Sequence, residues 1–323
     1  MKRILAVLMI MTMAFALVGC GKQSTGVAEK VRVGYAAGVP TANLILAKVE
    51  GYFEDELKDM GIDVEWFPFL NGPPLNEAIA AGEIDIGFLG DVAFMMAKAS
   101  GQNTVIFSKG SEGEPVFALT IAKDSPITSV EQLKGKKVAF TRGTIMHRLL
   151  YNLLTKSGLS LSDVEHVNIP GSDIANAINL KQVEAGVLWE PFIASNIQNG
   201  ILKVLADGTG AQSNSCYNIV VEKFANENPK ILEAFIRAME RANKDIVADP
   251  KKAAEKTKDE LGLPAQTVEE LLLKMKFTSV ISDSDMEELR EIEKFLRDEK
   301  LTENTVNVNK AIDRSYLKTL GME

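Results

Sequence analysis

The amino-acid sequence predicts an α/β protein with two lobes and a helical C-terminal tail. From residue 31 onward, segments with the two-residue period of a strand alternate with segments of helical period. This alternation is typical of sheets that are covered by helices. Two longer apolar segments, 116–122 and 216–221, link two groups of short strands. Two such groups joined by two long strands predict a bilobed body with a cleft between the lobes.

The first group of elements is expected to form lobe I, which we assign to residues 31–114 together with 216–323. Its strands are expected at 31–35, 62–66, 84–88 and 104–107, and its helices at 42–50, 75–81 and 92–99. The β-α-β-α order predicts a mainly parallel sheet with helices on its faces.

The second group is expected to form lobe II, residues 115–215. Its strands are expected at 116–122, 138–140, 164–169 and 186–189, and its helices at 145–157 and 173–180. The strand at 216–221 then returns the chain to lobe I. The tail is expected to form helices at 231–247, 251–261, 267–275 and 285–299, with helix boundaries at Asp249-Pro250 and Leu263-Pro264.

The N-terminus has the features of a secretion signal. Lys2 and Arg3 precede an apolar run, and residues 17–20 (Leu-Val-Gly-Cys) match a bacterial lipobox. We therefore predict a lipoprotein signal peptide at 1–19 and a lipidated tether at 20–30 that begins with lipidated Cys20. The protein would then work outside the cytoplasm, anchored to the cell membrane by lipid. An ordinary signal peptide with a chance cysteine is the alternative.

Composition argues against several classes of function. The 323 residues include 36 basic and 44 acidic side chains, for a net charge of −8, and no basic cluster contains interleaved aromatic residues. This balance argues against a nucleic-acid partner. The sequence has none of the common motifs of serine hydrolases, zinc proteases, phosphate loops or dinucleotide-binding loops. Since these motifs are absent, we expect no catalytic residue and no cofactor. We also expect no metal site, because the two histidines lie in no metal-ligand pattern.

Four segments together resemble a known family. They are 51–55 (Gly-Tyr-Phe-Glu-Asp), 81–91 (Ala-Gly-Glu-Ile-Asp-Ile-Gly-Phe-Leu-Gly-Asp), 133–144 with His147, and 188–192 (Leu-Trp-Glu-Pro-Phe). In this order and spacing they resemble the substrate-binding proteins of ABC importers for aliphatic sulfonate, taurine and nitrate. The resemblance covers residues 31–323, with the motifs concentrated in 31–222. The family often has a proline soon after the position of Asp91, and this chain does not.

The resemblance implies a two-lobed periplasmic-binding-protein fold of the cluster II type. It implies that the lobes close on a small ligand, that the loaded protein docks to an ABC permease driven by an ATPase, and that the ligand is not chemically changed. We expect a monomer.

In lobe II, residues 141–144 are expected to turn from a strand into a helix. Backbone N–H groups at a helix start form an anion site, so Arg142, Gly143 and Thr144 are candidate ligand contacts, with a plain N-cap turn as the alternative. His147 could contact the ligand or be a satisfied surface histidine. Trp189 could form the floor of the pocket or pack in the core, and Glu190 could orient the ligand or brace the lobe.

In lobe I, Gly90 and Asp91 follow an expected strand. Asp91 could cap the next helix, accept a hydrogen bond from a ligand amine, or do both. By the resemblance, the remaining site positions fall at strand ends, on Tyr35, Thr41, Asn71 and Gly72.

The leading hypothesis is an ABC-importer receptor for a small anion such as an aliphatic sulfonate, taurine or nitrate. A receptor for a heterocycle such as a thiamine-pyrimidine precursor is the alternative, with Trp189, Tyr35 and Phe88 as stacking surfaces. An enzyme on this fold would need a reactive Cys/His cluster, which the sequence lacks. An interaction protein without a ligand is the third possibility.

Overall fold

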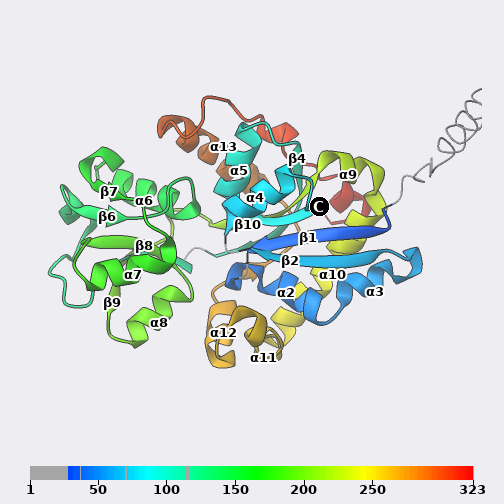
Figure 1. The fold of residues 1–323 in the computed structure, drawn as a ribbon, viewed down its shortest axis with the longest axis horizontal. Helices are drawn as coiled ribbons and strands as arrows, with labels where there is room; N and C mark the ends of the chain where they lie inside the picture. The colour runs from blue at the N-terminus through cyan, green and yellow to red at the C-terminus, as the bar shows by residue number, and fades with distance from the viewer. Residues whose placement is uncertain (1–27, 37, 70, 114–115, 323) are drawn as a thin grey trace, which may run out of the picture.

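The computed structural model describes residues 28–36, 38–69, 71–113 and 116–322, which form two α/β lobes placed end to end along the longest axis (Figure 1). The expected signal peptide and the expected lipidation at Cys20 lie outside the described residues, as does most of the expected tether. Among the described residues, no helix combines the length and the apolar composition needed to cross a bilayer.

The first lobe is built on a six-stranded sheet with the order β11-β4-β10-β3-β1-β2. The strands are β1 (Lys30–Ala36), β2 (Asp63–Phe69), β3 (Ile86–Gly90), β4 (Thr104–Glu112), β10 (Ser215–Val221) and β11 (Lys276–Phe277). Strand β1 pairs in parallel with β2 and β3, whereas β10 is antiparallel to both β3 and β4. The prediction of a mainly parallel sheet therefore needs a correction: the returning long strand β10 and the short edge strand β11 each run against their neighbours.

Helices cover both faces of this sheet (Figure 1). They are α2 (Ala42–Val49), α3 (Tyr52–Leu57), α4 (Gly72–Ala80), α5 (Asp91–Ala99), α9 (Glu222–Glu227), α10 (Pro229–Ala248), α11 (Pro250–Leu261), α12 (Ala265–Leu272), α13 (Asp283–Asp298) and α14 (Ser315–Thr319), with a 3-10 turn η1 (Val39–Thr41). The longest, α10, begins with proline at its first position and buries one face. On that face, Phe235 packs edge-on against Phe53 and Phe107, at ring-centroid distances of 5.1 and 5.5 Å.

The second lobe is built on a five-stranded sheet with the order β7-β6-β8-β5-β9. Its strands are β5 (Phe117–Ala122), β6 (Lys137–Ala139), β7 (Glu165–Val167), β8 (Ala185–Trp189) and β9 (Leu202–Asp207), and its helices are α6 (Ile145–Lys156), α7 (Gly171–Asn179) and α8 (Phe192–Gln198). The pattern repeats that of the first sheet. Strand β6 is parallel to β7 and β8, and the first long strand, β5, is antiparallel to β8 and β9.

The chain passes between the sheets twice, once between β4 and β5 and once between β9 and β10. The lobe boundaries at 114/115 and 215/216 remain our proposal. The first sheet takes its strands from 30–112, 215–221 and 276–277, and the second takes its strands from 117–207; these ranges depart from the proposed boundaries only at Ser215, which was assigned to lobe II and begins β10 of the first sheet.

Helix α13 of the tail contacts both lobes. It packs on α5 of the first lobe. Its Phe295 also meets the rings of His147 and Tyr151 on α6, at centroid distances of 5.1 Å each. The tail therefore holds α6 against the first lobe.

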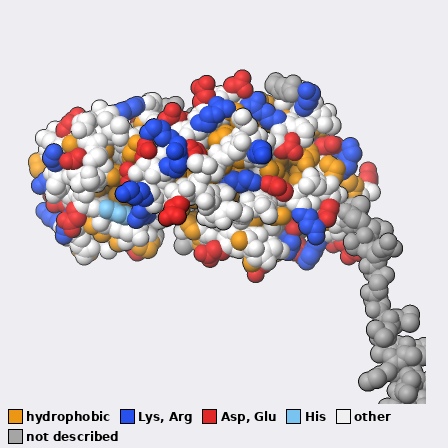
Figure 2. All heavy atoms as spheres, turned by 90° about the horizontal axis from the view of Figure 1, so that it is seen from above, with side chains coloured by type: hydrophobic (Ala, Val, Ile, Leu, Met, Phe, Trp, Pro, Cys, Tyr) orange, Lys and Arg blue, Asp and Glu red, His pale blue; other side chains and the backbone are white. Residues whose placement is uncertain are grey.

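The surface carries both signs of charge. In the face shown in Figure 2, acidic and basic side chains are interspersed, and no large area of that face is of one sign. This distribution agrees with the composition, which argues against a nucleic-acid partner.

Candidate ligand-binding site

The carboxyl ends of β1, β2 and β3 lie at one edge of the first sheet, because the three strands run in the same direction. Helices α4 and α5 begin at this edge, directly after β2 and β3. In the second lobe, α6 and α7 likewise begin just after β6 and β7. In open α/β sheets, ligands bind beyond the carboxyl ends of the strands.

Two glycines show that these edges face each other. A Cβ atom built on Gly90, the last residue of β3, would lie 2.7 Å from Cδ1 of Ile145, the first residue of α6. A Cβ atom on Gly143, just before α6, would lie 2.6 Å from the sulfur of Met96 on α5. Gly143 also has a φ of 73°, which disfavours any other residue. The turn before α6 therefore touches the first lobe.

The turn at 141–144 uses several of its own polar groups. The N–H of Gly143 donates to Nδ1 of His147 at 3.2 Å, and the hydroxyl of Thr144 donates to the carbonyl of Thr141 at 2.7 Å. Nη2 of Arg142 lies 3.5 Å from the carbonyl oxygen of Glu299. The sequence-based hypothesis gave these groups to an anion directly. In the structure the groups of Gly143 and Thr144 shape the turn, Arg142 reaches the tail at Glu299, and the start of α6 remains as the anion-attracting feature.

His147 is buried, with 3% of its surface exposed, so the expectation of a surface histidine was wrong. Its ring stacks on Phe140 at a centroid distance of 4.8 Å and meets Phe295 edge-on. Burial, together with the nearby positive charge of His166 and Arg142, lowers the pKa of His147 to about 3. Nδ1 of His147 can accept the N–H of Gly143 only while the imidazole ring is neutral. His147 therefore positions the turn.

Trp189 lies at the end of β8 and is half-buried. Its ring meets Phe192 in a T-shape at 5.0 Å. The other side lies against Gly171, the first residue of α7, where a Cβ atom would come within 2.0 Å of Cζ3 of Trp189. The indole therefore covers the start of α7, and sequence reasoning missed Gly171 as the residue that makes room for it.

Glu190 braces the second lobe against the first. Its side chain is buried, and Oε2 accepts the N–H of Ala194 at 2.9 Å. Its other oxygen accepts from Nζ of Lys274, which follows α12, at 3.2 Å. Of the two roles considered for Glu190, the contacts match the bracing role.

Asp91 begins α5 and is 1% exposed. Its two oxygens accept the N–H of Val92 at 2.6 Å and the N–H of Ser215 at 3.3 Å. Burial raises the pKa of Asp91 to about 6, an effect that the positive charge of Arg148 partly offsets. Asp91 thus joins the start of α5 to the start of β10, next to the point where the chain returns from the second lobe.

Asn71 and Gly72, the predicted residues at the start of α4, have different roles in the structure. Asn71 is exposed at the N-cap of α4, and its side chain makes no cap hydrogen bond. Gly72 lets α4 approach α5, since a Cβ atom there would lie 2.9 Å from Cβ of Ala93. Both lie at the edge where β2 ends.

Tyr35 and Thr41 do not offer their side chains to a ligand. The Tyr35 ring is fully buried, and its hydroxyl accepts from Nζ of Lys48 at 3.1 Å. The Thr41 hydroxyl is within 2.7 Å of the carbonyl oxygen of Gly38, so it closes its own turn. Phe88 is also buried, under Gly110. Of the three stacking surfaces considered for a heterocycle, Trp189 alone is partly exposed.

Sequence reasoning also missed Arg148. This arginine on α6 is 4% exposed and pairs with Glu288 of α13 at 2.5 Å. Oε1 of Glu288 further accepts the N–H of Ser213 at 3.3 Å, in the segment that returns to the first lobe. The pair joins α6, α13 and the returning segment, and nothing in the local sequence marks residues 140 positions apart as partners.

Within the described ranges, no group of three or more His, Cys, Asp or Glu side chains is arranged to hold a metal ion. The Cys216 thiol is buried, which raises its pKa to about 12. A thiol in that state is a packed apolar group rather than a nucleophile.

Known proteins with the same architecture include receptors for small solutes. The chain is 27% identical over 320 residues to a Bacillus subtilis (strain 168) protein named for binding aliphatic sulfonates, covering 96% of this chain and 95% of that protein. It matches the alkanesulfonate-binding protein of Xanthomonas axonopodis pv. citri, solved with bound MOPS, with a TM-score of 0.80 and 25% identity, over 89% of this chain and 99% of that one.

One relative is named as an enzyme. It is the 4-amino-5-hydroxymethyl-2-methylpyrimidine phosphate synthase of Aspergillus parasiticus, 27% identical over 234 residues, covering 68% of this chain and 66% of that protein. Residues 40–253 match the family described as NMT1/THI5 like. With that match spanning more than half of its length, this two-lobed protein belongs to the NMT1/THI5-like family.

Proposed function

We propose that this protein is the solute-binding component of an ABC importer and that its ligand is a small anion. The ligand would be an aliphatic sulfonate, taurine or a nitrate-like compound, bound between the lobes and delivered to a permease. One observation carries the proposal: the start of α6 lies against the carboxyl end of β3, where Gly90 meets Ile145. A helix start carries partial positive charge, so this position favours an anion.

The relatives support the same chemistry. The Bacillus subtilis relative is named for aliphatic sulfonates, and it covers almost the whole chain. The Xanthomonas axonopodis protein holds MOPS, whose acidic group is a sulfonate. An anionic head at the start of α6, with an apolar body against the exposed part of Trp189, would suit such compounds.

The proposed ligand-binding residues come from both lobes. They are Asn71, Gly72, Gly90, Arg142, Gly143, Thr144 and Trp189, of which Gly143 and Thr144 are kept because they form the start of α6. His147 and Glu190 act behind them, the first by holding the turn and the second by bracing the lobes. Tyr35, Thr41 and Asp91 are omitted, since their polar side-chain atoms are engaged within the protein.

We propose that the protein acts outside the cytoplasm as a monomer anchored by lipid on Cys20. The support is the lipobox at 17–20 and the short polar segment that separates it from the first described strand. A tether keeps a loaded receptor at high effective concentration near its permease.

A pyrimidine ligand is the second candidate. It is favoured by the pyrimidine-phosphate synthase relative and by the exposed part of the Trp189 ring, on which a heterocycle could stack. Among the described residues, no group of three or more His, Cys, Asp or Glu side chains could hold a metal ion.

A thermal-shift screen of residues 21–323 separates the two. The panel is alkanesulfonates, taurine, nitrate and aminopyrimidines. A ligand present at a hundredfold excess over its Kd should stabilise the protein by about 2.7 kcal/mol. Stabilisation by sulfonates and not by pyrimidines is the expected result, and the reverse pattern would overturn the anion proposal.

A further inference from the structure

The sequence contains two Asn-Gly pairs, Asn71-Gly72 and Asn199-Gly200. Asparagine is a chemically labile residue, and most of all before glycine. The backbone nitrogen of the glycine can attack the side-chain amide carbon of the asparagine, and glycine has no Cβ atom to hinder that attack. Both asparagines are exposed, so exposure does not distinguish them. The surroundings of the two glycine nitrogens do.

The two glycine nitrogens differ in hydrogen bonding. Gly72 is the first residue of α4, and its N–H makes no hydrogen bond to any residue that the structure describes. The first N–H groups of a helix have no partner within the helix. The N–H of Gly200, in contrast, donates to the carbonyl of Ile197 at 2.9 Å. Since the attacking nitrogen must first lose its proton, this bond protects the pair at 199–200.

The helix dipole favours reaction at the same pair. Gly72 lies at the N-terminal end of α4, a helix of nine residues. The partial positive charge at this end stabilises a nitrogen that has lost its proton. Asn199 lies at the C-cap of α8, where the partial charge is negative.

The backbone conformations differ in the same sense. Asn71 is extended, with a ψ of −176°, which places the Gly72 nitrogen gauche to Cβ of Asn71 and within reach of a rotating Cγ. Asn199 has a ψ of 0°, which turns the Gly200 nitrogen farther from the Asn199 side chain. The Asn71 side chain also makes no cap hydrogen bond that would hold it away from the Gly72 nitrogen.

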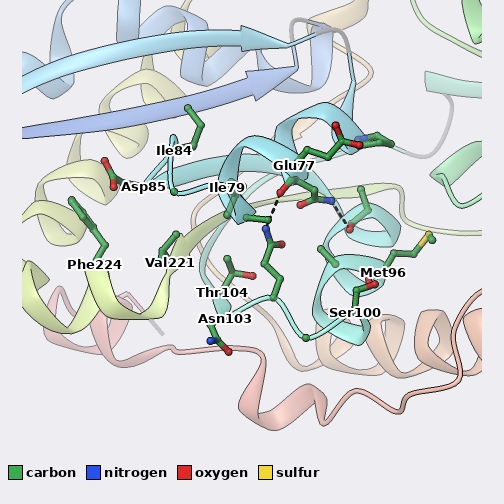
Figure 3. Close-up of a pocket in the computed structure, with 18 of the residues that line it drawn as sticks. Glu77, Ile79, Ile84, Asp85, Met96, Ser100, Asn103, Thr104, Val221 and Phe224 are labelled. Carbon is green, nitrogen blue, oxygen red and sulfur yellow. Dashed lines mark hydrogen bonds between the residues drawn. The ribbon is translucent and has the colours of Figure 1, made fainter.

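Helix α4 is held in place by α5. Nδ2 of Asn76 donates to the carbonyl of Ala93 on α5 at 3.0 Å. Figure 3 shows the two helices side by side, with Glu77 labelled on α4 and Met96 on α5. The first turn of α4 is therefore part of the folded structure, and so is the unbonded nitrogen of Gly72.

We propose that Asn71 is a modification site, at which the folded protein deamidates spontaneously while Asn199 is preserved. The deprotonated nitrogen of Gly72 attacks Cγ of Asn71 and closes a five-membered succinimide. The bond from Cγ to the side-chain nitrogen breaks, and ammonia leaves. Water then opens the ring at either carbonyl group, which gives aspartate or isoaspartate. In sum, one water molecule is consumed, one ammonium ion is released, and one carboxylate remains on the protein.

The consequence for binding rests on the proposed function. Asn71 is one of the residues that we place around the anion. A carboxylate at this position would repel an anionic ligand. The receptor would therefore lose affinity for its ligand as the protein ages.

Peptide mass spectrometry of residues 21–323, incubated at mildly alkaline pH, tests the modification directly. In the folded protein, conversion at Asn71 should be at least tenfold faster than at Asn199. In guanidinium chloride the two rates should be similar, because the structural differences are then lost. Asn71→Gln should show no conversion at this position, since its longer side chain would have to close a six-membered ring. Equal rates in the folded protein, or the same tenfold ratio in denaturant, would overturn the proposal.

Calorimetry with an alkanesulfonate separates this proposal from the proposed function. The aged parent protein should bind at least fivefold more weakly than the fresh protein, as Asn71→Asp should. Asn71→Gln should keep its initial affinity throughout the incubation. Conversion without any loss of affinity would leave the modification site in place and would remove Asn71 from the proposed anion site. Sulfonate binding without conversion at Asn71 would overturn the modification alone.

Discussion

Nδ1 of His147 accepts the backbone N–H of Gly143 at 3.2 Å, and this bond fixes the turn that brings α6 against the first lobe. The same turn places Gly143 on Met96, so one buried ring determines how the two lobes meet. A histidine that sequence reasoning considered as a ligand contact or a surface group is thus a structural support of the candidate site.

His147→Phe should lower the free energy of unfolding by about 1–3 kcal/mol. Phenylalanine keeps the ring between Phe140 and Phe295 but leaves the Gly143 N–H without its acceptor. Urea denaturation measures the change. His166→Phe is the control, because His166 also stacks on Phe140 but is exposed, and it should change stability much less. Equal losses in the two variants would contradict the role assigned to the Gly143 bond.

His147 and Asp91 should change the stability of the protein in opposite directions as the pH falls. His147 has a pKa of about 3 in the folded protein against 6.5 for an ordinary histidine, so the unfolded chain binds the extra proton between these values. Stability from His147 is therefore present above pH 6.5 and lost as pH falls toward 3. Asp91 has a pKa raised from 3.8 to about 6, so the folded chain binds the extra proton. Its effect favours the folded state at low pH and is lost as pH rises through 6.

Asp91→Asn removes one of these opposing effects. Between pH 6 and pH 4, stability should then fall more steeply with acid than in the parent protein, by up to about 1.4 kcal/mol per pH unit. Urea denaturation at several pH values measures both slopes. Parallel curves for the variant and the parent would show that Asp91 does not take up a proton in this range.

Arg148→Met should destabilise the protein by about 3–5 kcal/mol, because it leaves Glu288 without its partner in a mostly buried position. Adding Glu288→Gln should recover part of that loss, which a double-mutant cycle measures. Lys134→Met, which breaks an exposed pair with Asp163, is the control and should cost less than about 1 kcal/mol. A loss in Arg148→Met no larger than in the control would mean that this pair does not hold α6 to α13.

Gly171→Ala tests the placement of Trp189. The added methyl group would lie about 2.0 Å from the indole, so the ring must move from the start of α7. We expect at least tenfold weaker binding of the preferred ligand and a shifted tryptophan emission spectrum. Ser172→Ala, at the next and exposed position, should change neither. Unchanged affinity together with a shifted spectrum would place the Trp189 ring outside the binding site.

Local periodicity sufficed to predict most elements of the fold. The helix expected at 145–157 is α6, Ile145–Lys156, and the strand expected at 186–189 is β8, Ala185–Trp189. The short helix α3, Tyr52–Leu57, and the edge strand β9, Leu202–Asp207, were missed. Strand β9 is mostly half-exposed, so it lacks the contrast between buried and exposed positions on which such a prediction relies.

The candidate site was harder to predict, because side-chain direction depends on contacts far apart in the sequence. Tyr35 ends up beside Lys48 and Glu260, and Arg148 pairs with Glu288. Neither partnership leaves a local pattern. The turn at 141–144 was placed correctly before a helix, since glycine and threonine favour such a turn wherever it occurs. Which of its polar groups remain for a ligand depends on His147, and that required the structure.

The most direct test of the account compares ligand affinity in Thr144→Asp and Thr144→Asn. Both residues are good N-caps and have nearly the same shape, so the start of α6 is preserved and one negative charge is the difference. Isothermal titration calorimetry with the preferred alkanesulfonate should show at least tenfold weaker binding to Thr144→Asp than to Thr144→Asn. Equal affinities in the two variants would contradict the claim that this protein holds an anion at the start of α6.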